Sequence, residues 1–283
     1  MGAQLRVFRR RIRSVQATKK ITKAMELIAS SRIVKAQQRL DASMPYLTQL
    51  VDAVSAAASH ASDVSKHPLT AKADKQESAA VLVITADRGL AGAYSTNAIK
   101  EGEALTRNLG EKGMKVIPYV VGRKGVSYYR FRGRAMGGEY TGFTDQPTYA
   151  DAKRIGEDLL AAFHGDENGE GGVDEIHVVY THFVNMGTQE TRVRRILPLE
   201  VVDEVVETSE GGMPFPLYEF EPGPEAVLDA LLPRYIEQMV YLSLLTSAAS
   251  EHAARRRAMK SATDNAEELI RSLTRQANQA RQA

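Results

Sequence analysis

The chain has 283 residues, of which 43% are hydrophobic and 25% are charged, a size and composition typical of roughly two globular domains. It contains no cysteine, which excludes a disulfide framework, thiolate zinc sites and a cysteine nucleophile. Its longest apolar stretches are much shorter than the ~20 residues that a membrane-spanning helix needs. The net charge of +2 hides an asymmetry, because residues 1–40 contain eleven Lys and Arg but a single acid, Glu26.

Residues 1–58 are predicted to form one long helix, because apolar residues recur at steps of 3 and 4 and glycine is absent between Ala3 and Gly89. The pattern breaks at residues 19–20 and changes phase twice. Such slips indicate a helix that packs along one partner with local changes of winding. Pro45 is expected to bend it. After the break the apolar positions are Ile21, Met25 and Ile28, followed in a new phase by Ile33, Ala36, Leu40, Met44, Leu47, Val51 and Val54.

Residues 224–283 are predicted to form a second long helix. Alternating steps of 3 and 4 run for seven heptads from Leu228 to Ala280, and Pro233 is expected to restart or kink this helix. Small or polar residues occupy many of these seam positions, among them Ala249 and Thr263, and such a seam stabilises a two-stranded coil weakly. Rods of about 75–80 Å do not fit inside a compact domain. The sequence therefore predicts that the two terminal helices pair as an antiparallel coiled coil.

The segment between the rods, residues 76–205, has a different pattern. Buried-type strands are expected at 79–85, 116–121, 175–183 and 191–197, with helical sequence between them, including 124–131 and 149–163. Strands that alternate with helices predict an α/β fold: a small open Rossmann-like domain with right-handed crossovers, inserted between the two long helices.

The segment DRGLAG, residues 87–92, follows the first strand, where doubly wound folds bind phosphates. Its GxxG spacing is not GxGxxG, and the chain contains no P-loop motif. The alternative is a tight turn in which Asp87 caps the following helix. The acidic loop at 165–172 starts like a calcium loop, but His177 stands where the twelfth-position Glu belongs. No catalytic, cofactor-binding or metal-binding residue is predicted.

The basic first helix admits three interpretations. It can be a nucleic-acid-binding arm, whose affinity would fall steeply with salt. It can meet acidic loops of partner subunits, where charge complementarity sets the register of the contact. It can also be a solvated face, the commonest role of a charge run.

Three segments, in order along the chain, carry a family resemblance: KKITKAMELIASSRIVKAQQRL at 19–40, ITADRGLAGAYSTN at 84–97 and ASEHAARRRAMKSATDNAEELI at 249–270. Together with the rest of the chain they resemble the gamma subunit of rotary F-type ATP synthase, and the extra loop at 165–172 is similar to actinobacterial members. The resemblance implies a central-stalk rotor at the cytoplasmic face of the bacterial plasma membrane, without a catalytic residue, cofactor or nucleic-acid partner of its own. Its partners would be the alpha and beta hexamer, the epsilon subunit and the c-subunit ring, its only link to the membrane.

The resemblance also implies roles for single residues. Met25 falls at the family's KAME position beside the beta lever, and Arg281 with Gln282 falls at the ARQA position, which engages the catch loop of a beta subunit. Residues 218–225 correspond loosely to the foot near the c ring, represented by Tyr218 and Glu221. Family members usually continue past ARQA with an ITQE-type segment, which this sequence does not contain. The alternative function is a nucleic-acid-binding protein with a basic coiled-coil arm.

Overall fold

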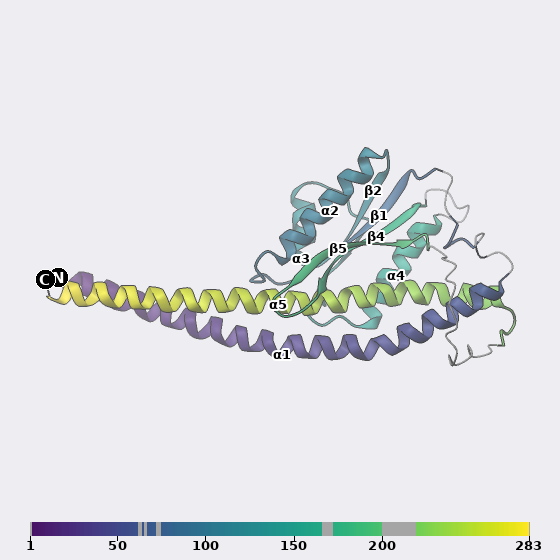
Figure 1. Cartoon of the computed structure of the whole chain (residues 1–283). Helices are drawn as coiled ribbons and strands as arrows, with labels where there is room; N and C mark the ends of the chain where they lie inside the picture. The colour runs from purple at the N-terminus through teal and green to yellow at the C-terminus, as the bar shows by residue number, and fades with distance from the viewer. Residues whose placement is uncertain are drawn as a thin grey trace.

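The computed structural model describes residues 2–61, 64, 67–71, 75–165, 172–199 and 219–282. Two helices of 59 residues each, α1 (Gly2–His60) and α5 (Pro224–Gln282), run antiparallel along the whole molecule. Figure 1 shows both chain termini at one tip of this rod and an α/β domain packed on the opposite half. The antiparallel pairing of the terminal helices is confirmed. The boundary predicted at residue 205 lies outside the described residues.

The domain is built on a five-stranded sheet with strand order β3-β2-β1-β4-β5. β5 is antiparallel to β4, and the other neighbouring strands are parallel. The strands are β1 (Ser78–Ile84), β2 (Lys115–Val121), β3 (Gly138–Tyr140), β4 (Glu175–Phe183) and β5 (Gln189–Leu197), and the helices between them are α2 (Tyr94–Glu111), α3 (Arg123–Phe131) and α4 (Tyr149–His164). The predicted Rossmann-like architecture is confirmed, and β3 is an additional strand that the sequence pattern did not indicate.

The face of α1 that packs on α5 follows one unbroken heptad, so the phase slips predicted from the apolar residues are wrong. Polar residues occupy the register at Lys19, Thr22 and Glu26, where the apolar pattern breaks. Met44 and Val51, expected on the packed face, are exposed. The positions of this heptad, every one of them buried or half-buried, are Leu5, Phe8, Ile12, Val15, Lys19, Thr22, Glu26, Ala29, Ile33, Ala36, Leu40, Ser43, Leu47, Leu50, Val54 and Ala57.

The restart or kink predicted at Pro233 does not interrupt α5, which is continuous through this residue. A proline inside a helix removes one backbone hydrogen bond and costs about 3 kcal/mol. Leu232 and Ile236, on either side of it, are fully buried in the core that α5 shares with α4 and the sheet. We attribute the continuity of the helix to this packing.

The small and polar residues in the middle of α5 serve the sheet as well as the helix pair. Here α5 lies between α1 on one side and β4 with α4 on the other, as Figure 1 shows. From Ile236 to Arg255 its residues are buried except for the half-buried Tyr241 and Leu242. The backbone of β4 bonds directly to its side chains: the N–H of Phe183 donates to Thr246 Oγ1 at 2.9 Å, and Ser250 Oγ donates to the carbonyl of Thr181 at 3.0 Å. A seam interpretation alone was therefore incomplete, because small residues here let a strand edge approach the helix.

Candidate functional site

Beyond the α/β domain the ends of α1 and α5 project as a two-helix rod (Figure 1). Polar contacts join the helices there. The hydroxyls of Thr22 and Thr263 hydrogen-bond at 2.7 Å, and Lys19 Nζ lies 3.3 Å from a carboxylate oxygen of Glu267. Lys19 and Arg271 together hold the pKa of Glu267 below its ordinary value. The rod is thus held by specific polar pairs as well as by apolar contacts.

A stripe of apolar side chains lies on α1 outside the heptad seam. Ile21 is 61% exposed, Ile28 is 54% exposed, and Met25, half-buried, lies between them at helical spacing. We call these three residues the outer stripe. The prediction that Ile21 and Ile28 face α5 is wrong, because Thr22, Glu26 and Ala29 take the buried positions beside them. Contiguous exposed apolar residues are typical of a surface that binds a partner.

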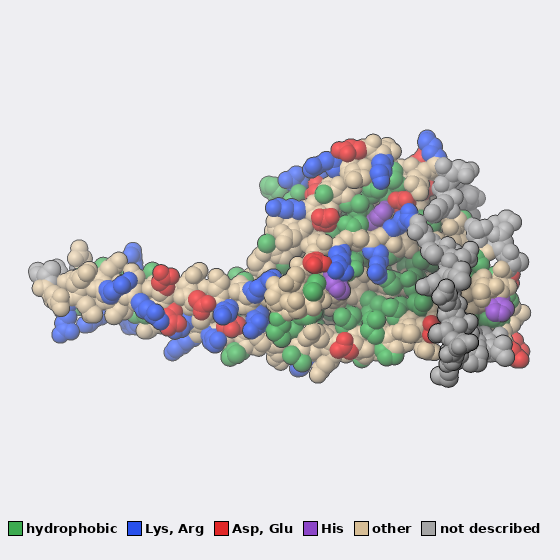
Figure 2. All heavy atoms as spheres, viewed as in Figure 1, with side chains coloured by type: hydrophobic (Ala, Val, Ile, Leu, Met, Phe, Trp, Pro, Cys, Tyr) green, Lys and Arg blue, Asp and Glu red, His purple; other side chains and the backbone are tan. Residues whose placement is uncertain are grey.

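Cationic side chains lie beside the outer stripe. Figure 2 shows Lys and Arg side chains along the projecting rod, with Asp and Glu side chains among them. Lys20 and Lys23 are exposed next to the stripe, and Lys23 Nζ also lies 3.0 Å from Glu26. A surface that combines apolar side chains with cations favours a partner segment that is apolar and acidic.

The structure distributes the other expected site residues along the molecule and does not bring them together. Arg281 and Gln282 are exposed in the last turn of α5. They lie eighteen residues or more beyond Thr263, the level of the outer stripe, which corresponds to about 27 Å along the rod. Glu221 is exposed and lies three residues before Pro224, where α5 begins. Figure 1 shows that α5 begins at the end of the molecule opposite the two chain termini. Tyr218 lies outside the described residues.

The loop after β1 uses its carboxylate for structure. Asp87 Oδ2 accepts hydrogen bonds from the N–H groups of Gly142 (2.7 Å) and Thr144 (3.1 Å), and Oδ1 accepts one from Arg123 N (3.1 Å). Arg123 is the first residue of α3, so Asp87 caps α3. The expectation that it caps the next helix along the chain, α2, is wrong, because the loop between them carries α2 away and the start of α3 lies closer to the end of β1.

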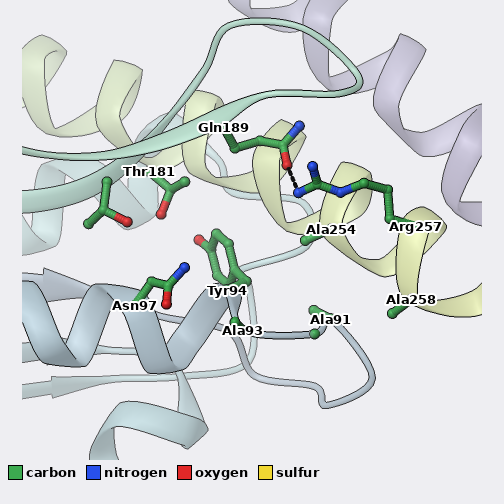
Figure 3. A pocket seen from close by; sticks show the side chains of 11 residues that line it. Ala91, Ala93, Tyr94, Asn97, Thr181, Gln189, Ala254, Arg257 and Ala258 are labelled. Atoms are coloured by element: carbon green, nitrogen blue, oxygen red, sulfur yellow. Dashed lines mark hydrogen bonds between the residues drawn. The ribbon is translucent and has the colours of Figure 1, made fainter. Parts of the chain in front are cut away.

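A cavity of about 330 Å³ opens at the same end of the sheet, between the start of α2, strands β4 and β5, and α5. Figure 3 shows Tyr94 and Thr181 inside it and Arg257 at its rim, where the guanidinium donates to Gln189 Oε1. Alanines form much of the remaining wall. In the described part of the chain, no group of three His, Asp or Glu is arranged to hold a metal ion.

Across these described ranges, no helix combines the length and the apolar character that a membrane span requires.

The chain matches known proteins over its whole length. A family model described as ATP synthase matches residues 4–283. The ATP synthase gamma chains of Kineococcus radiotolerans and Acidothermus cellulolyticus are 60% and 61% identical to it, covering all of this chain and 92% and 93% of their own lengths.

Solved structures with a similar fold include the central stalk and c ring of the Tetrahymena thermophila mitochondrial ATP synthase, with a TM-score of 0.61 and 22% identity over 86% of this chain and 99% of that one. The rotor of the Euglena gracilis mitochondrial enzyme gives a TM-score of 0.64 with 17% identity over 100% of this chain and 99% of that one. By sequence and by fold, the chain belongs to the ATP synthase gamma-chain family.

Proposed function

We propose that this chain is the central-stalk rotor subunit of a proton-driven ATP synthase, which passes torque between a membrane c ring and the catalytic sites of an alpha and beta hexamer. The observation that carries the proposal is the projecting rod with an apolar and cationic face outside its own seam. Family membership supports it and leaves the nucleic-acid hypothesis without support.

The rod is suited to work inside a sleeve of other subunits. The seam between its helices is filled by its own residues, so the exposed Ile21 and Ile28 are available to a partner. Acidic lever loops on beta subunits would complement the neighbouring Lys20 and Lys23. In this arrangement Met25 lies beside the beta lever, and Arg281 with Gln282 engages a catch loop nearer the tip.

The α/β domain would stand toward the membrane, with the epsilon subunit bound to it and Glu221 in the foot near the c ring. The chain contributes mechanical coupling and no catalytic residue. It is peripheral, at the cytoplasmic face of the bacterial plasma membrane, and reaches the membrane only through the c ring.

The test is reconstitution. The purified chain is mixed with an alpha and beta preparation, and size exclusion followed by an ATPase assay measures stoichiometry and activity. We expect one copy per hexamer and stimulated hydrolysis. A folded chain that forms no such complex would refute the rotor assignment.

A second test addresses the outer stripe. Met25→Lys adds a cation beside the proposed acidic lever, so we expect fewer protons pumped per ATP hydrolysed with little loss of assembly. Gln16→Lys, an exposed position of the same helix about 140° away from Ile21, is the matched control and should leave that ratio unchanged. An unchanged ratio in Met25→Lys would remove this residue from the mechanism.

A further inference from the structure

The loop between β3 and α4, residues 141–148, touches both long helices at one level of the rod. Asp145 Oδ2 accepts a hydrogen bond from Arg32 Nη1 of α1 at 2.6 Å, and the two groups form an ion pair. The backbone carbonyl of Asp145 lies 3.0 Å from His252 Nε2 of α5, which donates to it. One residue of the domain therefore holds α1 through its side chain and α5 through its backbone.

The loop is also fixed to the sheet. The Asp87 carboxylate at the end of β1 binds the N–H groups of Gly142 and Thr144, and Thr144 Oγ1 accepts from the N–H of Asp87 at 2.9 Å. Because each segment donates backbone N–H groups to a side chain of the other, the loop has little freedom to move relative to the strand. A force on the sheet is therefore passed to the loop that carries Asp145.

On the α5 side, His252 lies in a cluster of buried polar residues within one helical turn. Arg255 Nη2 donates to Glu251 Oε1, and both residues are buried together with His252. A buried ion pair contributes little net stability, but it holds its members in one arrangement. Burial of Glu251 raises the pKa of its carboxyl, against the opposing effect of Arg255.

The two helices are attached to the domain in different ways. α5 is hydrogen-bonded directly to β4: Thr246 accepts from the backbone of the strand, and Ser250 donates to it. α1 packs on the same level through Ile33 and Ala36, which contact Phe183 and α5 by apolar surfaces alone. Apolar contacts resist separation but have no directional preference, so they resist sliding less well than an ion pair with defined geometry.

We propose that Asp145 is a positioning residue that locks α1 and α5 to the α/β domain, so that torque on the domain reaches both helices together. The inference rests on the proposed rotor function. Without the Arg32–Asp145 bridge, torque would enter through α5 and reach α1 only along the helix seam and through apolar contacts such as that of Ile33 with Phe183. The helices would then slip before the outer stripe on α1 moved its partner.

The experiment uses the assembled complex and compares proton pumping per ATP hydrolysed. Asp145→Asn keeps the carbonyl that His252 binds and removes the charge that Arg32 binds. We expect it to assemble, to hydrolyse ATP at a rate near that of the wild type, and to lose coupling by about twofold or more. Glu139→Gln is the matched control, because it removes a surface ion pair with Arg130 inside the domain and should not change coupling.

The charge swap Arg32→Asp with Asp145→Arg separates this bridge from any other role of Arg32. We expect each single reversal to uncouple the complex and the swap to restore at least half of the loss. Arg32→Gln, on the helix surface, is measured in parallel and should lose coupling by about twofold or more, as expected for Asp145→Asn. It keeps the inference testable if a loop variant fails to fold.

Two results would overturn the inference: wild-type coupling in Asp145→Asn or Arg32→Gln, or a swap no better than the single reversals. Failure of the proposed function would look different, because the wild-type chain itself would then form no complex with the hexamer.

Discussion

Acid is expected to destabilise the folded chain through His252. Its imidazole is buried in the level where α5 meets the α/β domain, at 1% exposure. Burial lowers its pKa from 6.5 to about 4, against the hydrogen bond to Asp145, and Arg255 and Arg32 add to the lowering. The folded state therefore holds this group neutral at a pH where the unfolded chain protonates it.

The free energy of unfolding therefore depends on pH through the proton that His252 binds. Because the pKa of His252 is lower in the folded chain than in the unfolded chain, stability is at its full value above pH 6.5 and falls as the pH drops toward 4. A shift from 6.5 to about 4 corresponds to about 3 kcal/mol in total, of which about 2 kcal/mol is lost by pH 5.

The assay is urea unfolding of the isolated chain at pH 7.5 and pH 5, with His252→Gln as the comparison. Glutamine keeps an N–H donor for the Asp145 carbonyl but does not titrate. We expect the free energy of unfolding to fall by about 2 kcal/mol more in the wild type than in the variant. His182→Gln is a control: burial also lowers the pKa of His182, but this residue is only half-buried, so its replacement should change the acid sensitivity less. Equal acid sensitivity of the wild type and His252→Gln would refute this reasoning.

Two further predictions concern backbone and seam. Gly122 has φ +92°, and an added Cβ would lie 2.4 Å from the carbonyl oxygen of Thr85. Gly122→Ala should therefore lower the free energy of unfolding by at least ~2 kcal/mol. As a control, Gly110→Ala, whose Cβ would meet no atom within 4 Å, should leave the stability unchanged or raise it by up to about 1 kcal/mol. Similar thermal midpoints for the two variants would contradict this. Thr22→Val and Thr263→Val should each cost about 1 kcal/mol, while the double variant costs less than the sum because no hydroxyl loses its partner; strictly additive urea data would show that the hydroxyl pair contributes nothing.

The strands and helices were predicted within a few residues because parallel strands are continuous apolar runs and long helices have clear periodicity. α4 begins as predicted at Tyr149, and β4 spans the predicted 175–183. β3 escaped prediction because three residues carry no measurable period.

The heptad of α1 was misassigned for a physical reason. Sequence patterns identify a seam by its apolar residues, but here Lys19 and Thr22 occupy seam positions and find their partners on α5. The apolar Ile21 and Ile28 were then assigned to the seam although they are exposed. A partner-binding stripe and a packing seam give the same periodicity, and only the folded pair distinguishes them.

The candidate site was only partly accessible from sequence. The motif around Met25 pointed to the segment of α1 that carries the outer stripe, but the sequence did not show that Ile21 and Ile28 are exposed there. The roles of Met25, Arg281 and Gln282 remain predictions, and Asp145 could not be identified at all, because its contacts join residues more than a hundred positions apart.

The unbroken repeat of α1 has a consequence for the stiffness of the rod. A strict seven-residue period implies a left-handed supercoil, and helices of 59 residues, about 88 Å long, complete a little more than half of a ~150 Å pitch. Twisting such a pair in one sense tightens the wrap of the helices, while twisting it in the other sense opens their seam. We therefore expect the torsional stiffness of the helix pair to differ between the two directions of rotation.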